Sequence, residues 1–305
     1  MILVTKQPTG FVIVDKPAGM TSHDVVARMR RLAGTRKVGH GGTLDPMATG
    51  VLVVAVGQIT RLLTFVTGCD KSYEATIRLG QATITDDAEG DITATVSTEG
   101  VTDDAINTTL STMSGHVKQV PSAVSAVKID GKRAYKRVRD GEDVEIPARE
   151  VTISRLEVRD IRRVTTDPEQ FGAIDVDITV DCSTGTYIRA IARDLGTALG
   201  VGGHLTRLRR TRVGGFTIDE SKTLDALAEA ESPITHTTVE TVTRLMPRRD
   251  IEAAEATTLG HGGRIPLSGV AGPYAAIDPN GRVVAVVVER DGRTKSLVVL
   301  PESTA

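Results

Sequence analysis

Two segments in the middle of the chain carry the repeat that most restricts the fold. Residues 151–159 and 173–181 place apolar side chains at nearly every second position, as strands do when one face packs on a core and the other meets water. Segments with helical spacing also occur, but without the regular strand–helix–strand rhythm of a parallel sheet. The sequence therefore predicts an α+β fold with a mixed, largely antiparallel central sheet flanked by helices.

Further elements follow from apolar runs, helical spacing and capping residues. Ser22 is expected to cap a helix that ends near Leu32, and Thr102 to cap a helix over 103–113. After residue 245, short β runs between Gly- and Pro-rich turns predict a small all-β domain over 246–305. The other expected elements are strands over 11–15, 51–56, 73–79, 274–277, 283–288 and 296–300, and helices over 60–67, 132–139 and 185–199.

Composition excludes several classes of protein. The chain has 305 residues, of which 40% are hydrophobic and 25% charged, so a packed core is expected rather than disorder. No run approaches the roughly 18 apolar residues of a membrane span, and the N-terminus lacks the apolar segment of a secretory signal. Cys69 and Cys182 cannot form a disulfide framework, and the six histidines lack metal-binding spacing. A cytoplasmic protein without membrane association or a metal site is expected.

Charge is balanced in total and uneven along the chain. Lysine and arginine together number 37, and aspartate and glutamate 39, which argues against a uniformly cationic surface. Basic residues gather in 128–139 and 189–212, and acidic residues in 86–104. This separation is typical of a polyanion-binding face with an acidic opposite side. Ordinary solvated surfaces would explain it equally well.

A glycine-rich loop, residues 38–46, carries side chains suited to chemistry. Its glycines allow sharp turns or close approach to a ligand. Pro46 keeps Asp45 out of helical dihedrals, which fixes the direction of the carboxylate. With His40 in the same loop, this arrangement suits a catalytic acid, base or nucleophile. The alternative is that Asp45 and Pro46 simply close a turn.

Six motifs in a fixed order include this loop. They are DKPAGMTSHD (15–24), GHGGTLDPMATGVL (39–52), KSYEATIRLG (71–80), VPSAVSAVKIDGKRAY (120–135), CSTGTYIRAIARDLG (182–196) and GGHLTRLRRTRVGGF (202–216). Together they closely resemble the bacterial tRNA pseudouridine-55 synthases, the TruB family. The resemblance implies a pseudouridine synthase-like catalytic domain over 1–245, with an RNA-binding insertion at about 121–147. The segment 246–305 resembles a PUA-like RNA-binding domain.

The resemblance assigns catalytic roles to three residues. It implies that Asp45 is the catalytic carboxylate, that Arg189 is its ion-pair partner and that Tyr73 stacks on the target base. An arginine beside a carboxyl group lowers its pKa and keeps it ionised, and an aromatic ring offers a π face to a base.

The resemblance also implies a substrate-binding set. His40 is expected to insert into the RNA loop, and Tyr187 and Leu208 to contact the substrate. Lys16 is expected to support the floor of the site. Contacts to the RNA backbone are expected from the basic clusters: Lys128, Lys132, Arg133, Lys136, Arg137, Arg207, Arg209 and Arg210.

The implied reaction is the isomerisation of the T-loop uridine at position 55 of tRNA, without metal or cofactor. A C–N glycosidic bond breaks and the uracil rejoins the ribose through carbon, with no change of redox state. The base must first be flipped out of the RNA loop, which costs a few kcal/mol. Attack on the ribose, addition to the uracil and abstraction of a sugar proton all remain open as the role of Asp45.

Two other functions fit part of the sequence. A catalytic subunit of a guide-RNA particle would share the motifs, although long terminal extensions, which this chain lacks, are expected there. A non-enzymatic RNA chaperone would use the same binding residues without Asp45, and assistance to tRNA folding can accompany catalysis. The expected partner is the tRNA T-arm stem-loop, bound by a monomer that needs no obligate protein partner.

Overall fold

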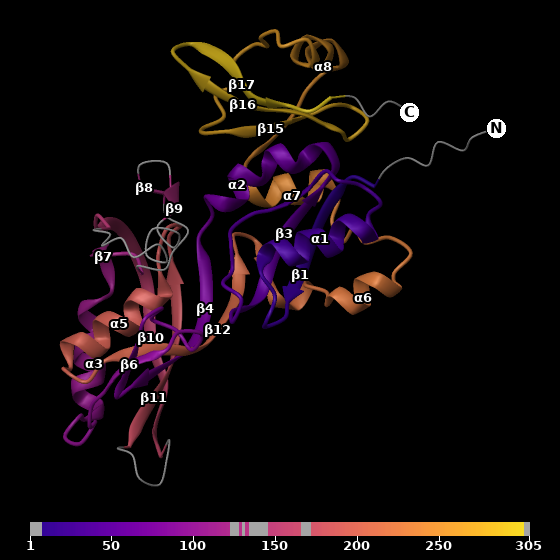
Figure 1. Ribbon diagram of the computed structural model, residues 1–305. Coiled ribbons are helices and arrows are strands. Elements are labelled where there is room, and N and C mark those ends of the chain that lie inside the picture. Colours follow the sequence, from indigo (N-terminus) through magenta and orange to yellow (C-terminus); the bar gives the residue numbers. More distant parts are fainter. Residues whose placement is uncertain (1–7, 123–127, 130–131, 134–145, 166–171, 302–305) are drawn as a thin grey trace. The chain divides into compact units, whose positions relative to one another are not determined.

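The computed structural model describes residues 8–122, 128–129, 132–133, 146–165 and 172–301 (Figure 1). The chain divides into two compact units. Unit 1 comprises Met1–Pro46, Gly50–Cys69 and Arg212–Ala305, and unit 2 comprises Met47–Thr49 and Asp70–Thr211. Most of unit 2, the segment Asp70–Thr211, is therefore inserted between two segments of unit 1.

The first half of unit 1 is an antiparallel sheet whose central strand is buried on both faces. Strand β3 (Thr49–Val56) pairs with β1 (Gly10–Lys16) and with β2 (Val38–His40). Because side chains alternate along a strand, Val12 and Val14 of β1 face one hydrophobic cluster, whereas Phe11 and Ile13 face another. Helices α1 (Ser22–Leu32) and α6 (Leu224–Glu229) contribute to the first cluster.

The second cluster continues into a C-terminal sheet of unit 1. That sheet has the order β14-β15-β16-β17, with bounds Arg248–Asp250, Tyr274–Ile277, Val283–Arg290 and Arg293–Val299. Ala275 and Val286 pack in the same cluster as Phe11, together with residues of α2 (Leu63–Thr67) and α7 (Thr238–Leu245). Helix α8 (Ala253–Gly260) packs on the opposite face through Leu259. The C-terminal β strands are thus confirmed, and α7 and α8 are additions that the sequence pattern did not predict.

Unit 2 is built on strands in the order β12-β4-β11-β10-β7. The pairs β4–β11, β11–β10 and β10–β7 are antiparallel. Helix α5 (Ile188–Ala198) packs so closely against the start of β12 (Gly203–Val213) that a Cβ on Gly196 would lie 2.1 Å from the backbone carbon of Gly202, so only glycine fits there. The bounds are β12 (Gly203–Val213), β4 (Lys71–Leu79), β11 (Ala173–Cys182), β10 (Arg149–Val164), β7 (Gly115–Gln119), α3 (Asp103–Thr112) and α5 (Ile188–Ala198).

Short elements complete the two units. Unit 2 also contains two short antiparallel strand pairs, β5 (Gln81–Thr83) with β6 (Ile92–Thr95), and β8 (Lys128–Ile129) with β9 (Lys132–Arg133). In unit 1, η1 (Gly57–Leu62) is a 3₁₀ helix before α2, η2 (Ile218–Glu220) follows β13 (Phe216–Thr217), and β13 pairs with the end of β12. The α+β class and the flanking helices agree with the prediction.

Three local expectations need correction. The helix expected over 132–139 is wrong at Lys132 and Arg133, which form a strand; the rest of that segment lies outside the described residues. The cap of α1 is Thr21, which forms a capping box with Asp24. The helix expected over 60–67 is divided between η1 and α2.

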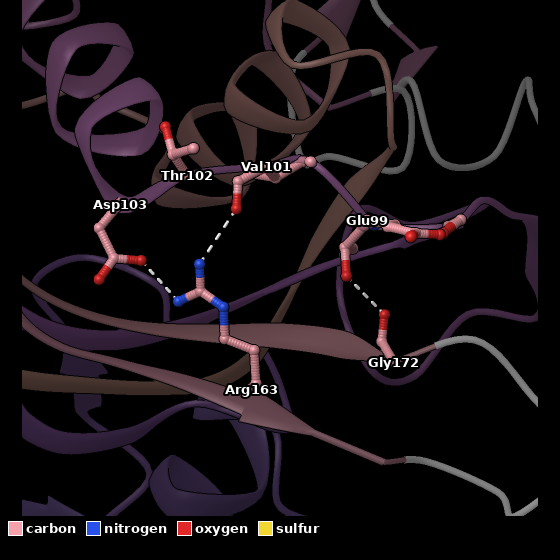
Figure 2. Close-up of a pocket in the computed structure, with 9 residues that line it drawn as sticks. Glu99, Val101, Thr102, Asp103, Arg163 and Gly172 are labelled. Atoms are coloured by element: carbon pink, nitrogen blue, oxygen red, sulfur yellow. Dashed lines mark hydrogen bonds and ion pairs between the residues drawn. The ribbon is translucent and has the colours of Figure 1, made fainter.

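Unit 2 also contains an open pocket of about 680 Å³, lined by residues 97–103, Arg163 and Gly172 (Figure 2). Arg163 donates to the Asp103 carboxylate at 2.5 Å and to the Val101 carbonyl at 3.0 Å. Thr98 Oγ1 donates to the Gly172 carbonyl at 2.6 Å. These contacts connect the loop before α3 to strands β10 and β11, which gives the polar lining a structural role.

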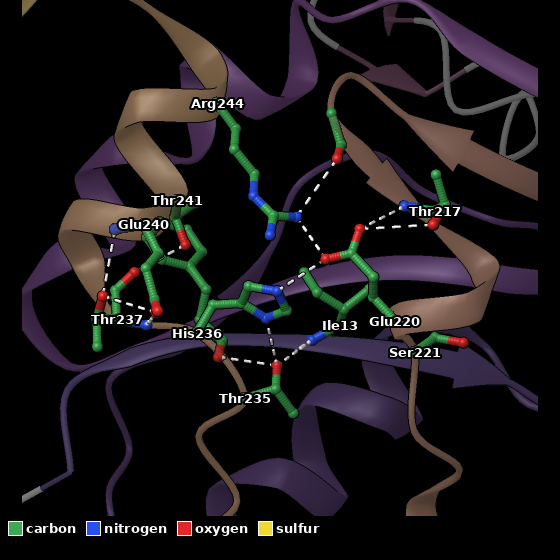
Figure 3. Close-up of polar contacts among 12 residues, drawn as sticks. Ile13, Thr217, Glu220, Ser221, Thr235, His236, Thr237, Glu240, Thr241 and Arg244 are labelled. Atoms are coloured by element: carbon green, nitrogen blue, oxygen red, sulfur yellow. Dashed lines mark hydrogen bonds and ion pairs between the residues drawn. The ribbon is translucent and has the colours of Figure 1, made fainter. Parts of the chain in front are cut away.

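A polar network stabilises the junction of β1, η2 and α7 in unit 1 (Figure 3). The Glu220 carboxylate accepts from Arg244 and lies 3.1 Å from His236 Nε2. His236 Nδ1 lies 2.9 Å from Thr235 Oγ1, which accepts the backbone N–H of Ile13 at 3.0 Å. Burial opposes ionisation of Glu220, but the hydrogen bonds from Arg244 and His236 outweigh it and lower its pKa from 4.5 to about 2.

The Glu220→Gln variant is expected to lose a pH-dependent part of the stability. Because the folded-state pKa lies below the ordinary value, the ionised carboxylate stabilises the fold above pH 4.5, and this contribution disappears as the pH falls to about 2. The group is partly exposed, so the loss at neutral pH should be about 1 kcal/mol or less. Urea unfolding from pH 7 to pH 2 tests this. If the free energies of unfolding of variant and wild type differed by the same amount at every pH, the prediction would be contradicted.

Candidate active site

In unit 1, backbone contacts hold the loop that carries Asp45 from both sides. Before Asp45, the Leu44 N–H donates to Ser22 Oγ at 2.9 Å, and Ser22 Oγ donates to the Leu44 carbonyl at 3.1 Å. After Asp45, the Pro46 carbonyl accepts from Lys16 Nζ at 3.1 Å and from the Gly19 N–H at 2.9 Å. Hydrogen bonds thereby hold both neighbours of Asp45, whose own side chain is half-buried.

Lys16 is completely buried, and its ammonium also donates to the carbonyls of Pro17 and Met20, at 2.8 and 2.5 Å. A buried ammonium surrounded by three carbonyl oxygens is well satisfied. Lys16 therefore bonds the backbone of the residue that follows Asp45.

The loop itself depends on glycine. Gly42 has φ +97°, a conformation that side chains rarely adopt. A Cβ on Gly41 would lie 2.5 Å from Val66 Cγ1 of α2. His40, the last residue of β2, lies edge-on to His23, with ring centroids 5.4 Å apart. In unit 1, Lys16 thus bonds the residue after Asp45, and His40 contacts His23, the neighbour of the Ser22 that bonds Leu44.

Unit 2 carries the other expected site residues on neighbouring elements. Tyr73 lies on β4 opposite Val180 of β11 and is 8% exposed. Tyr187 is the N-cap residue of α5, and Arg189 follows in the first turn. Leu208 is a buried residue of β12, the strand next to β4.

Arg189 forms an ion pair that the sequence did not suggest. Its Nη1 lies 3.2 Å from Asp87 Oδ2 and donates to the Thr85 carbonyl at 3.0 Å. The side chains of Arg189 and Asp87 are only 8% and 3% exposed. Asp87 and the Thr85 carbonyl therefore hold the guanidinium of Arg189 in position.

A second pair lies beside the first. Arg193, one turn further along α5, lies 3.4 Å from Asp86 Oδ2. Burial raises the pKa of Asp86, although Ser122 and Arg193 counteract the effect. Part of the acidic segment 86–104 thus pairs with the basic segment 189–212. The expected separation into a basic face and an acidic opposite side is wrong at Asp86 and Asp87.

The residues expected at the RNA backbone differ in exposure. Arg207 is exposed and lies 3.1 Å from Glu74, whereas Arg210 is only 1% exposed. Arg209 Nη1 donates to Thr49 Oγ1 at 3.3 Å. Lys136 and Arg137 lie outside the described residues, and for Lys128, Lys132 and Arg133 only the backbone is described.

Two further observations concern the described residues. Among them, no group of three or more His, Cys, Asp or Glu side chains could hold a metal ion. No helix in the described part of the chain is long and apolar enough to cross a bilayer.

Comparison with known proteins identifies the class of protein. Residues 30–188 match the TruB family pseudouridylate synthase N-terminal domain, residues 189–251 the tRNA pseudouridylate synthase B C-terminal domain, and residues 246–301 the tRNA pseudouridine synthase II C-terminal domain. The tRNA pseudouridine synthase B of Mycobacterium sp. (strain KMS) is 57% identical over 97% of each chain. That of Arthrobacter sp. (strain FB24) is 52% identical over 97% of each chain.

A solved structure shares the fold. The crystal structure of a Cbf5-Nop10-Gar1 complex contains a chain 26% identical, with a TM-score of 0.70, covering 96% of this chain and 85% of that one. Sequence and fold together define a pseudouridine synthase. The chain belongs to the TruB family, and its activity is the isomerisation of uridine to pseudouridine in tRNA.

Proposed function

We propose that the enzyme isomerises the T-loop uridine at position 55 of tRNA, with Asp45 as the key carboxylate and without a cofactor. The observation that carries the proposal is the double fixation of the Asp45 turn, through Leu44 and Pro46. A side chain that only closes a surface turn would not need a buried lysine and a buried serine hydroxyl to hold its neighbours. A carboxylate that must meet one atom of a flipped nucleotide benefits from such preorganisation.

The other residues receive roles in the same reaction. The resemblance assigns Arg189 to Asp45 as its ion-pair partner, and a cation in that place would favour the charged form of the carboxyl group. Tyr73 stacks on the flipped uracil, a contact worth about 1–3 kcal/mol. Tyr187 and Leu208 contact the same nucleotide, and His40 occupies the space that the base leaves in the RNA loop. These contacts offset the cost of a few kcal/mol for flipping.

The decisive assay uses an isolated T-arm stem-loop with an unmodified uridine at position 55. The purified protein is expected to convert this uridine to pseudouridine without any guide RNA. A stem-loop in which cytidine replaces the target uridine is the control. No conversion of the stem-loop would contradict the proposed substrate, and conversion only with added guide RNA would favour the guide-dependent alternative.

Electrostatic binding makes a second prediction. Phosphate contacts release counterions from RNA, so the affinity for tRNA should fall steeply as salt rises. Neutralising Lys132, Arg133, Lys136 and Arg137 should flatten the slope of log affinity against log salt by roughly 0.7–0.9 for each phosphate that the protein no longer neutralises. Filter binding between low and moderate salt measures the slope. An unchanged slope would indicate that these four residues do not contact phosphates and belong to an ordinary solvated surface.

The remaining expectations belong to the same proposal. The protein acts as a cytoplasmic monomer on the T-arm, and residues 121–147 and 246–305 serve as RNA-binding parts beside a catalytic domain within 1–245. Assistance to tRNA folding is compatible with these parts. The names of the relatives, which are tRNA-modifying enzymes, support the location.

A further inference from the structure

The last residue of β7, Gln119, is bonded on both sides to the backbone of one residue of unit 2. Its Nε2 donates to the Tyr187 carbonyl at 3.2 Å, and its Oε1 accepts the Tyr187 N–H at 3.0 Å. Gln119 is 5% exposed. A buried amide that satisfies a donor and an acceptor of the same residue fixes that residue in position and orientation.

Tyr187 needs such a partner because of its place in the fold. It is the N-cap residue of α5, and its own side chain makes no capping hydrogen bond. The chain enters α5 from a loop that contains Gly185, whose φ is +86°. Gln119, which is 68 residues away in sequence, supplies from a separate strand the constraint that the local sequence lacks.

The residues after Gln119 extend the contact to Arg189. The Val120 carbonyl accepts from Arg193 Nη2 at 2.8 Å. Ser122 Oγ lies 3.1 Å from the Thr85 carbonyl oxygen, which also accepts from Arg189 Nη1 at 3.0 Å. The segment 119–122 therefore contacts the backbone of Tyr187, the next turn of α5 and the carbonyl that orients Arg189.

From these contacts we propose that Gln119 is a positioning residue for pseudouridine formation. It fixes the start of α5, so that the Tyr187 ring and the Arg189 guanidinium keep the directions that the reaction needs. The inference rests on the proposed roles of Tyr187 and Arg189. Because Gln119 is buried and bonded to backbone, it acts through these residues.

The expected signature is a lower rate with unchanged binding. Small misplacements of catalytic groups cost up to about a hundredfold in rate. Gln119→Leu keeps the size of the side chain and removes both hydrogen bonds. It should lower the single-turnover rate at saturating enzyme by about 10- to 100-fold, and the Kd for tRNA should stay within about threefold of wild type. Gln119→Glu, which keeps the acceptor for the Tyr187 N–H, should give an intermediate rate.

Gln58→Leu is the matched control, since Gln58 is an exposed glutamine of η1. A wild-type rate in folded Gln119→Leu would overturn the proposal, and so would a lower rate explained entirely by a raised Kd. If Gln119→Leu does not fold, the variants Gln119→Glu and Ser122→Ala test the positioning role instead. A lowered rate at unchanged Kd supports the proposal, and wild-type rates in both variants overturn it.

The same experiment separates this inference from the proposed function. If the wild-type enzyme does not convert the T-arm stem-loop, the proposed substrate fails, and the Gln119 variants are then compared on full-length tRNA. If the wild type converts the stem-loop and the Gln119 variants do so equally fast, only the positioning role fails.

Discussion

Asp45→Asn is expected to lower the rate of pseudouridine formation by about a thousandfold or more. The change removes the charge, the basicity and the nucleophilicity of the carboxylate while it keeps nearly the same volume, and acid–base or covalent catalysis by one side chain contributes factors of this size. The turn itself should persist, because its contacts with Ser22 and Lys16 use the backbone of Leu44 and Pro46. The measurement is single-turnover conversion of a T-arm stem-loop.

Asp225→Asn is the matched control for this experiment. Asp225 is a surface carboxylate of unit 1, 84% exposed and paired with Arg28, and its replacement should leave the rate unchanged. The Kd for tRNA should remain close to wild type in both variants. A wild-type rate in Asp45→Asn would exclude Asp45 as the catalytic carboxylate, whatever the fold.

Asp87→Ala is expected to cost both stability and activity. The substitution deprives the buried Arg189 guanidinium of the carboxylate 3.2 Å away, and breaking a buried ion pair costs roughly 3–5 kcal/mol. Urea unfolding should show this decrease in stability. Conversion of tRNA should fall at the same time, since the orientation of Arg189 depends on Asp87 and on the Thr85 carbonyl.

The double variant Asp87→Leu/Arg189→Met separates the two effects. Apolar residues of similar size often replace a buried pair without loss of stability, so the double variant should recover much of the free energy of unfolding. It should nevertheless remain inactive, because the guanidinium is gone. Glu157→Ala, at an exposed pair with Arg155, is the control and should leave both stability and activity nearly unchanged. A stable and fully active Asp87→Ala protein would contradict the role given to this pair.

The sequence predicted most strands because their side-chain repeat reports directly on burial. The run at 11–15, apolar on both faces, becomes β1 between two hydrophobic clusters. The sequence indicated Ser22 as the cap of α1, whereas the structure has Thr21, and the difference comes from a contact distant in sequence. Thr21 and Ser22 both offer a hydroxyl, and only the contact of Ser22 with Leu44, 22 residues away, leaves the cap to Thr21.

The polar partners of the site were harder to predict. Asp87 lies in an acidic run that is typical of a solvated surface, and nothing near it in sequence indicates that the loop reaches α5, about 100 residues later. Gln119 carries no charge and belongs to no repeat, although it directly precedes the VPSAVSAVK motif. In both cases the pairing is decided by strand order, which composition and local spacing do not encode.

The C-terminal sheet has a consequence for how its role is studied. Ala275, Ile277 and Val283 pack in the same cluster as Phe11, Val51 and Val242. A chain shortened at residue 245 would leave Phe11, Val51 and Val242 facing water. The remaining polypeptide would tend to aggregate for reasons unrelated to RNA. Point changes on the solvent side of β17 (Arg293–Val299) are therefore a cleaner genetic tool than deletion.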